Sequence, residues 1–216
     1  MNPDDFGVNG GWGGLRTTKG LVEKFDYAAT QSDGDGHPIA WSDARAMFHT
    51  DGQTYETEKM STFKSGYAVR KFKNVDVNGN PGSDSSGDHP DMDVPIIRLA
   101  EVYLNYAEAV TRGGGGSMDT ATQLINELRS RAGASAISPA QLNTDMVMDE
   151  RSRELYWEGL RRPDLIRSNK FVSNMYVWPF KGGAANGTGV SDHLKLFPIP
   201  EDVLLVNPNI KQNPNY

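Results

Sequence analysis

The chain has 216 residues, with 22 lysines and arginines against 28 aspartates and glutamates, and no cysteine. An acidic balance without a basic cluster excludes a nucleic-acid backbone as the default partner. The lack of cysteine excludes disulfides, thiolate metal sites and thiol nucleophiles. No apolar run approaches the ~18 residues that a membrane-spanning helix needs.

Residues 1–93 form a loop-rich first segment, in which turn-forming residues separate short stretches. Such turns occur at residues 10–14, 33–36 and 78–82. Between them we expect one short helix at residues 17–25. We also expect a strand at residues 67–72 that leads to the hairpin-type dipeptide Asn78 and Gly79.

Residues 94–167 change to the period of helices. Asp93 is a good N-cap with Pro95 in the first turn, which predicts a helix from there to Gly113. Its expected apolar face consists of Ile96, Leu99, Ala100, Tyr103, Ala107 and Val110. After a glycine loop, a second helix ends at Gly133. Its expected apolar residues are Ala121, Leu124, Ile125, Leu128 and Ala132.

A third helix is expected after Asp145. Its apolar positions are Met148, Leu155, Tyr156 and Leu160. Pro163 should break it before a short turn at residues 164–167. Helices joined by short loops pack antiparallel to bury their apolar stripes, and pairs of this size resemble tetratricopeptide units. We therefore expect a mainly α fold of tetratricopeptide-like helical pairs, an α-α superhelix.

Residues 168–216 form an irregular tail. Prolines recur in it at Pro198, Pro200, Pro208 and Pro214. Because proline and the residue before it disfavour helix, we expect an extended, non-helical end. Nothing in this part indicates a second independent domain.

Three carboxylates at successive i,i+4 positions, Glu150, Glu154 and Glu158, should stack on one face of the third helix. One interpretation is a glycosidase that uses Glu150 and Glu154 as its carboxylate pair. The other interpretation is structural. Three unpaired carboxylates in a row would repel one another, so in this interpretation nearby arginines neutralise them. The arginines in reach are Arg98, Arg131, Arg153 and Arg161. All four histidines lie outside the expected helices, which removes a di-iron site, and we favour the structural interpretation.

Two other motifs point to no cofactor or metal. Ser61 and Lys64 match the Ser-x-x-Lys of serine β-lactamases, but the companion motifs are missing. Acidic residues between Asp84 and Asp93 offer oxygen ligands for Ca²⁺ without the spacing or closing glutamate of an EF-hand. We interpret them as a solvated acidic loop, and Ca²⁺ binding there stays open.

Aromatic residues in glycine- or proline-interrupted segments are the candidate ligand contacts. They are Trp12, Trp41, Tyr176 and Trp178. With Asn9 and Arg16 as nearby donors, a flat apolar ring of this kind suits the C–H face and hydroxyl rim of a sugar. In contrast, Tyr103, Tyr106, Tyr156 and Trp157 lie on expected helices, where we assign them to the core.

Three long segments together resemble the C-terminal part of the SusD/RagB family. The first covers residues 98–109 and 125–133, the second residues 150–167, and the third residues 197–200, 207–209 and 212–216. Weaker similarities at residues 12–14, 21–25 and 43–45 extend the resemblance over nearly the whole chain. It covers residues 1–216 as one region, with a ligand-side segment at 1–93, a helical core at 94–167 and the tail.

The resemblance implies a mostly helical fold and a non-enzymatic glycan-binding role in a TonB-dependent uptake system of Bacteroidetes. The implied partners are an oligosaccharide and a SusC-type transporter, and the implied location is the surface of the outer membrane. Family members normally have a signal peptide, a lipidated cysteine and a long helical N-terminal part. We therefore expect this chain to be a fragment of a longer protein. The alternative function is a helical-repeat scaffold that binds another protein.

Overall fold

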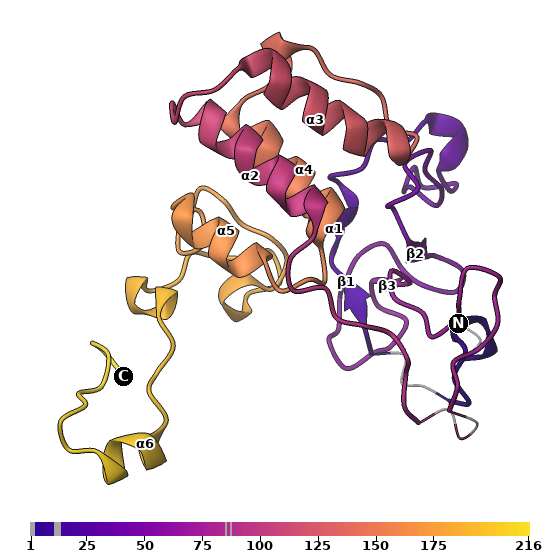
Figure 1. Cartoon of the computed structure of the whole chain (residues 1–216). Helices are drawn as coiled ribbons and strands as arrows, with labels where there is room; N and C mark the ends of the chain where they lie inside the picture. Colours follow the sequence, from indigo (N-terminus) through magenta and orange to yellow (C-terminus); the bar gives the residue numbers. More distant parts are fainter. Residues whose placement is uncertain (1–2, 11–13, 85, 87) are drawn as a thin grey trace. The chain divides into compact units, whose positions relative to one another are not determined.

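The computed structural model describes residues 3–10, 14–84, 86 and 88–216 (Figure 1). The chain divides into two compact units, residues 1–161 and residues 162–216. In the part of the chain that the structure describes, no helix combines the length and apolarity needed to cross a membrane.

Three helices form the main core of the first unit: α2 (Leu99–Thr111), α3 (Met118–Arg131) and α4 (Thr144–Leu155). Helix α2 packs against both α3 and α4 (Figure 1). The buried apolar side chains between them are Ala100, Leu104, Ala107, Ala121, Ile125, Leu128, Leu142, Val147 and Leu155. The expected mainly helical fold of paired helices is confirmed.

The ends of α3 and α4 follow ordinary capping chemistry. The Ser117 side chain accepts from the backbone N–H of Thr120, and the Asn143 side chain from that of Met146. Gly133, at a φ of +71°, follows the end of α3 as the sequence predicts.

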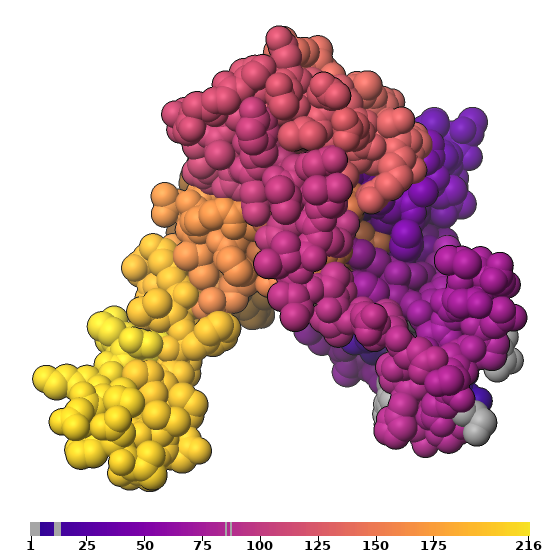
Figure 2. Space-filling view, viewed as in Figure 1, coloured from indigo at the N-terminus to yellow at the C-terminus, as the bar shows by residue number. Residues whose placement is uncertain are grey.

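The start of α2 corrects the sequence prediction. The helix begins at Leu99 rather than after Asp93, because Arg98 holds an extended backbone while its guanidinium binds two carboxylates. Ile96 and Leu99 therefore do not join the buried face, and Leu99 is 63% exposed. The segment at the start of α2 is at the surface (Figure 2, magenta). Leu104 is fully buried in the core instead of Ile96 and Leu99.

The end of α4 is a second correction. The helix stops at Leu155, Tyr156 is extended, and Trp157 takes a positive φ of 64°. The next helix, α5 (Arg161–Arg167), contains Pro163 in its first turn, where no backbone N–H is needed. The break thus precedes the proline, and Trp157 is 42% exposed instead of buried in the core.

Trp157→Gly is consequently expected to lower the free energy of unfolding by only about 1 kcal/mol, because glycine relieves the positive φ while some ring contact is lost. Phe25→Ala, at a residue that is 2% exposed, should cost about 3–5 kcal/mol. Urea unfolding of both variants measures the difference. If Trp157→Gly lost as much free energy of unfolding as Phe25→Ala, Trp157 would have to be assigned to the core.

A small antiparallel sheet and an aromatic cluster form the rest of the first unit. The strands β1 (Arg16–Thr17), β3 (Tyr67–Val69) and β2 (Phe48–His49) pair in that order. The expected strand at residues 67–72 is thus shorter, and it pairs with strands distant in the sequence. The hairpin-type turn at Asn78 and Gly79 is present and is closed by an isolated antiparallel bridge between Val75 and Pro81. The expected helix at residues 17–25 is present as α1 (Lys19–Val22). Short 3-10 helices lie at Pro3–Phe6, Ala29–Gln31 and Pro139–Gln141.

The second unit contains short helices where an extended tail was expected. They are 3-10 helices at Lys181–Gly183 and Asp192–Lys195, and α6 (Glu201–Val206). Most of this part is irregular, as expected, but the expectation that it holds no helix fails at α6, where Pro200 stands at the N-cap, so the prolines delimit the helix.

Side-chain amides at the end of the chain hold this unit together. Gln212 both accepts from the N–H of Ile199, at 2.8 Å, and donates to its carbonyl oxygen, at 2.9 Å. Asn213 donates to the carbonyl oxygen of Phe197 and the Tyr216 hydroxyl to that of Leu196, both at 2.8 Å. These bonds give the amide-rich end of the sequence a structural role.

Candidate functional site

The three glutamates that the sequence singled out lie in one buried network of charges. Glu150, with 0% side-chain exposure, accepts from Arg45, Arg129 and Arg153, each at 2.7 Å. A carboxylate in this position has all of its charge balanced by guanidinium groups.

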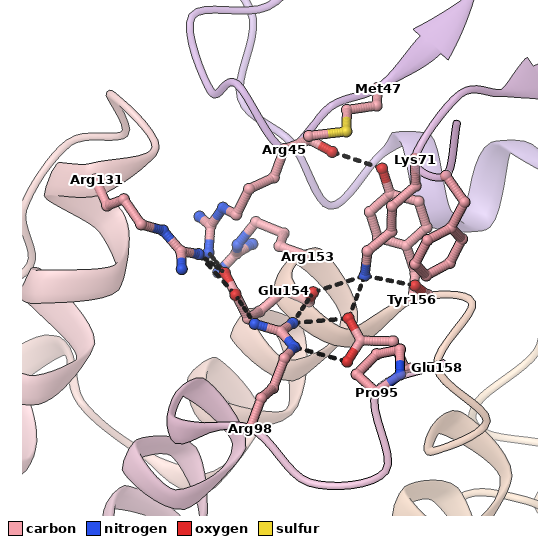
Figure 3. A pocket seen from close by; sticks show the side chains of 11 residues that line it. Arg45, Met47, Lys71, Pro95, Arg98, Arg131, Arg153, Glu154, Tyr156 and Glu158 are labelled. Atoms are coloured by element: carbon pink, nitrogen blue, oxygen red, sulfur yellow. Dashed lines mark hydrogen bonds and ion pairs between the residues drawn. The ribbon is translucent and has the colours of Figure 1, made fainter. Parts of the chain in front are cut away.

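Glu154 and Glu158 continue the network. Glu154 accepts from Arg98 at 2.5 Å and from Arg131 at 2.7 Å, with Arg45 at 3.2 Å. Arg98 also donates to both oxygens of Glu158 at 2.7 Å, and the Lys71 ammonium group binds Glu158 from the other side (Figure 3).

The predicted pairing is confirmed for Arg98, Arg131 and Arg153. Arg161, also expected here, donates to the carbonyl oxygen of Met148 at 3.1 Å. Sequence reasoning missed Arg45, Arg129 and Lys71. The spacing of Asp43 and Arg45 is a weak sequence indication that Arg45 is held in place. In the structure, Asp43 accepts two hydrogen bonds from the Arg45 guanidinium, at 2.9 and 2.7 Å.

The protonation states follow from competition between burial and the cations. Burial alone would raise the pKa of Glu154, yet hydrogen bonds from Arg131 and Arg98 outweigh it and hold that pKa at about 2. Burial would also raise the pKa of Glu150 and of Glu158, but the neighbouring cations outweigh it and lower both pKa values. A glycosidase acid needs a raised pKa, so this row lacks the proton donor of such a pair.

A cavity of about 300 Å³ opens beside the network (Figure 3). Its charged lining consists of Arg45, Lys71, Arg98, Arg131, Arg153, Glu154 and Glu158. Its less polar lining consists of Met47, Phe72, Pro95 and Tyr156. This cavity could not be predicted from the sequence, because its walls come from loops and helices far apart along the chain.

The predicted contacts near the N-terminus hold the loops in place. Asn9 donates to the carbonyl oxygen of Ser86. The Arg16 guanidinium donates to the carbonyl oxygens of Met60, at 2.7 Å, and Ser65, at 2.5 Å. Trp12 lies outside the described residues.

Trp41 belongs to an aromatic cluster that reaches the surface. Its ring meets Phe48 edge-on at 5.2 Å between centroids, and Tyr67 at 6.4 Å. Tyr55 also contacts Tyr67 and stacks on His37 at 4.6 Å. Trp41 is half-buried and thus both a packing residue and a partly open ring.

Tyr176 and Trp178, both in the second unit, are the two described candidates whose rings the structure brings into contact. Their ring centroids are 6.3 Å apart, and both rings are half-buried. The Lys170 and Lys181 ammonium groups lie 5.0 Å and 4.7 Å from the Tyr176 and Trp178 ring centroids. Lys181 also donates to the carbonyl oxygens of Ser173 and Tyr176, at 2.5 and 2.6 Å, which fixes the loop.

The chain matches the SusD family over residues 49–216. It is 41% identical over 207 residues to the starch-binding protein SusD of Bacteroides thetaiotaomicron, which covers 92% of this chain and 36% of that protein. The chain thus spans about a third of this curated relative.

Solved structures share the fold. A SusD-like protein from Bacteroides fragilis is similar with a TM-score of 0.63 and 23% identity, over 95% of this chain and 48% of that one. Surface glycan-binding protein A from Bacteroides uniformis has a TM-score of 0.59 and 26% identity, over 81% and 38%. The family match over most of the chain and the identity with a curated member show that this chain belongs to the SusD family.

Proposed function

We propose that this chain is part of a non-enzymatic glycan-binding protein. The observation that carries the proposal is the 41% identity, over nearly the whole chain, with a protein named for starch binding. The paired, ionised state of Glu150 and Glu154 supports binding over hydrolysis, because neither carboxylate is suited to donate a proton.

The protein would serve an outer-membrane uptake system, with a SusC-type TonB-dependent transporter as its partner. Cell fractionation tests the location, and co-purification with a transporter from the native organism tests the partner. Recovery of the native protein in the cytosolic fraction would contradict both.

The open aromatic rings are the proposed sugar contacts. Tyr176 and Trp178 offer two neighbouring rings at an angle of 61°, and the half-buried Trp41 offers a third. Stacking on a pyranose would remove further apolar area of these rings from water. Trp12, Asn9 and Arg16 remain candidates on sequence grounds.

A protein-binding scaffold is the second candidate. It is favoured by exposed apolar side chains in the segment before α2 and in the first turn of α2, namely Val94, Ile96, Ile97, Leu99 and Val102. Retention of starch by the chain would decide in favour of the glycan-binding function.

In affinity electrophoresis, the chain should be retarded by soluble starch, and Trp178→Ala should lose at least about tenfold of that affinity through the lost stacking. Trp157→Ala is the matched control, because Trp157 is an exposed tryptophan outside the proposed contacts. Circular dichroism checks that each variant is folded. Equal retardation of folded Trp178→Ala and wild type would remove this ring from the site.

A further inference from the structure

The cavity beside the glutamate network carries an excess of positive charge. In the network, six cations (Arg45, Lys71, Arg98, Arg129, Arg131 and Arg153) face four carboxylates (Asp43, Glu150, Glu154 and Glu158). The whole chain has the opposite balance, with a net charge of −6. The local excess is therefore a property of this cavity and attracts an anion to it.

Arg131 has hydrogen-bonding capacity left over. Its Nη2 group donates to both oxygens of Glu154, at 2.7 and 2.8 Å. Its Nε and Nη1 groups donate to no atom of the residues that the structure describes, and its side chain is 57% exposed. Nε and Nη1 can each donate a charge-assisted hydrogen bond to an oxygen of a carboxylate that enters the cavity.

Part of the cavity wall is aromatic. Phe72 and Tyr156 both line it, with Met47 and Pro95 beside them. The Tyr156 ring is fixed, because its hydroxyl donates to the carbonyl oxygen of Arg45 at 2.7 Å. A volume of about 300 Å³ lies at the small end of ligand sites and suits a single ring rather than a chain of sugars.

We propose that this cavity binds the carboxylate-bearing ring of an acidic sugar, a uronic acid, with Arg131 holding the carboxylate and Phe72 facing the ring. The proposal rests on the proposed glycan-binding function and names a second class of sugar for it. A neutral glucose unit does not neutralise the excess positive charge of the cavity, whereas a uronate supplies both a negative charge and an apolar ring face.

The test is calorimetric titration of the full chain with methyl glucuronide, against methyl glucoside and sodium sulfate at constant ionic strength. Glucuronide should bind in wild type, and glucoside should bind at least about tenfold more weakly. Arg131→Gln should weaken glucuronide about tenfold, and Arg131→Lys, which keeps the charge and the contact with Glu154, should lose part of the affinity.

Arg112→Gln is the matched control, because this half-exposed arginine pairs with Glu108 and does not line the cavity. It should leave glucuronide binding unchanged. Thermal melting checks the fold, and if Arg131→Gln fails to fold, the comparison of Arg131→Lys with Arg112→Gln decides.

Three results would overturn the assignment: equal binding of glucuronide and glucoside, unchanged glucuronide binding in both Arg131 variants, or sulfate binding as tight as glucuronide. The last would make the cavity a general anion site. Starch retention measured on the same samples separates this proposal from the proposed function. Absence of glucuronide binding with starch retention intact refutes only the cavity proposal.

Discussion

Glu150→Ala should lower the free energy of unfolding by about 3–5 kcal/mol, which is enough to leave little folded protein if the total is near the usual ~5–15 kcal/mol. The carboxylate is fully buried and accepts from Arg45, Arg129 and Arg153. Removing it takes the shared counter-charge from the buried Arg45 and Arg129 and from the partly buried Arg153. Urea unfolding at neutral pH measures the loss.

Glu56→Ala is the matched control. Glu56 makes one ion pair of 2.7 Å, with Lys19, and its side chain is 48% exposed. Pairs of this kind contribute about 0–1 kcal/mol, because water solvates both charges when the pair is lost. If the two alanine variants lose similar free energies, the buried network does not stabilise the fold as we infer.

The spacing of the glutamates predicts the core of this network because it depends on one helix. Glu150 and Glu154 share a face of α4 by helical geometry alone, and like charges in a row require cations nearby. Arg45 could not be predicted in the same way, because a loop brings it to Glu150 from 105 residues away in the sequence. Only tertiary packing sets that contact.

The end of α4 shows how packing overrides local pattern. The apolar spacing from Leu155 to Leu160 fits a continuing helix, but Tyr156 packs into the aromatic cluster of Phe25 and Phe48. Its hydroxyl is also bound to the carbonyl oxygen of Arg45. The helix ends where Tyr156 joins this second cluster, and Trp157 is thereby exposed.

The aromatic candidates show the same contrast between what the local sequence indicates and what tertiary packing determines. Sequence indicates that Trp41 lies in a loop, but it cannot indicate that the loop is held against a sheet whose strands come from three distant segments. Tyr176 and Trp178 lie only two residues apart in one loop, so they stay near each other however the loop folds, but the sequence does not indicate that their rings touch.

Acid should unfold the protein over the range in which Glu154 is protonated. Its pKa is about 2 in the folded chain, against an ordinary value of 4.5. A lowered pKa stabilises the fold above the unfolded value, and this stabilisation is lost as the pH falls from about 4.5 to about 2. For Glu154 alone it amounts to about 3 kcal/mol, and Glu150 and Glu158, whose pKa values are also lowered, act in the same direction.

Urea unfolding of the full chain at pH 7, 5, 4 and 3 tests this dependence, with Glu154→Gln as the informative variant. Glutamine cannot ionise, so the variant should be less stable than wild type at pH 7 and should lose less free energy between pH 5 and pH 3. Glu56→Gln, which removes an exposed carboxylate, should keep the wild-type dependence. If Glu154→Gln and wild type lose the same free energy over that range, the stabilisation does not come from the carboxylate that Arg98 and Arg131 hold, and other groups control acid unfolding.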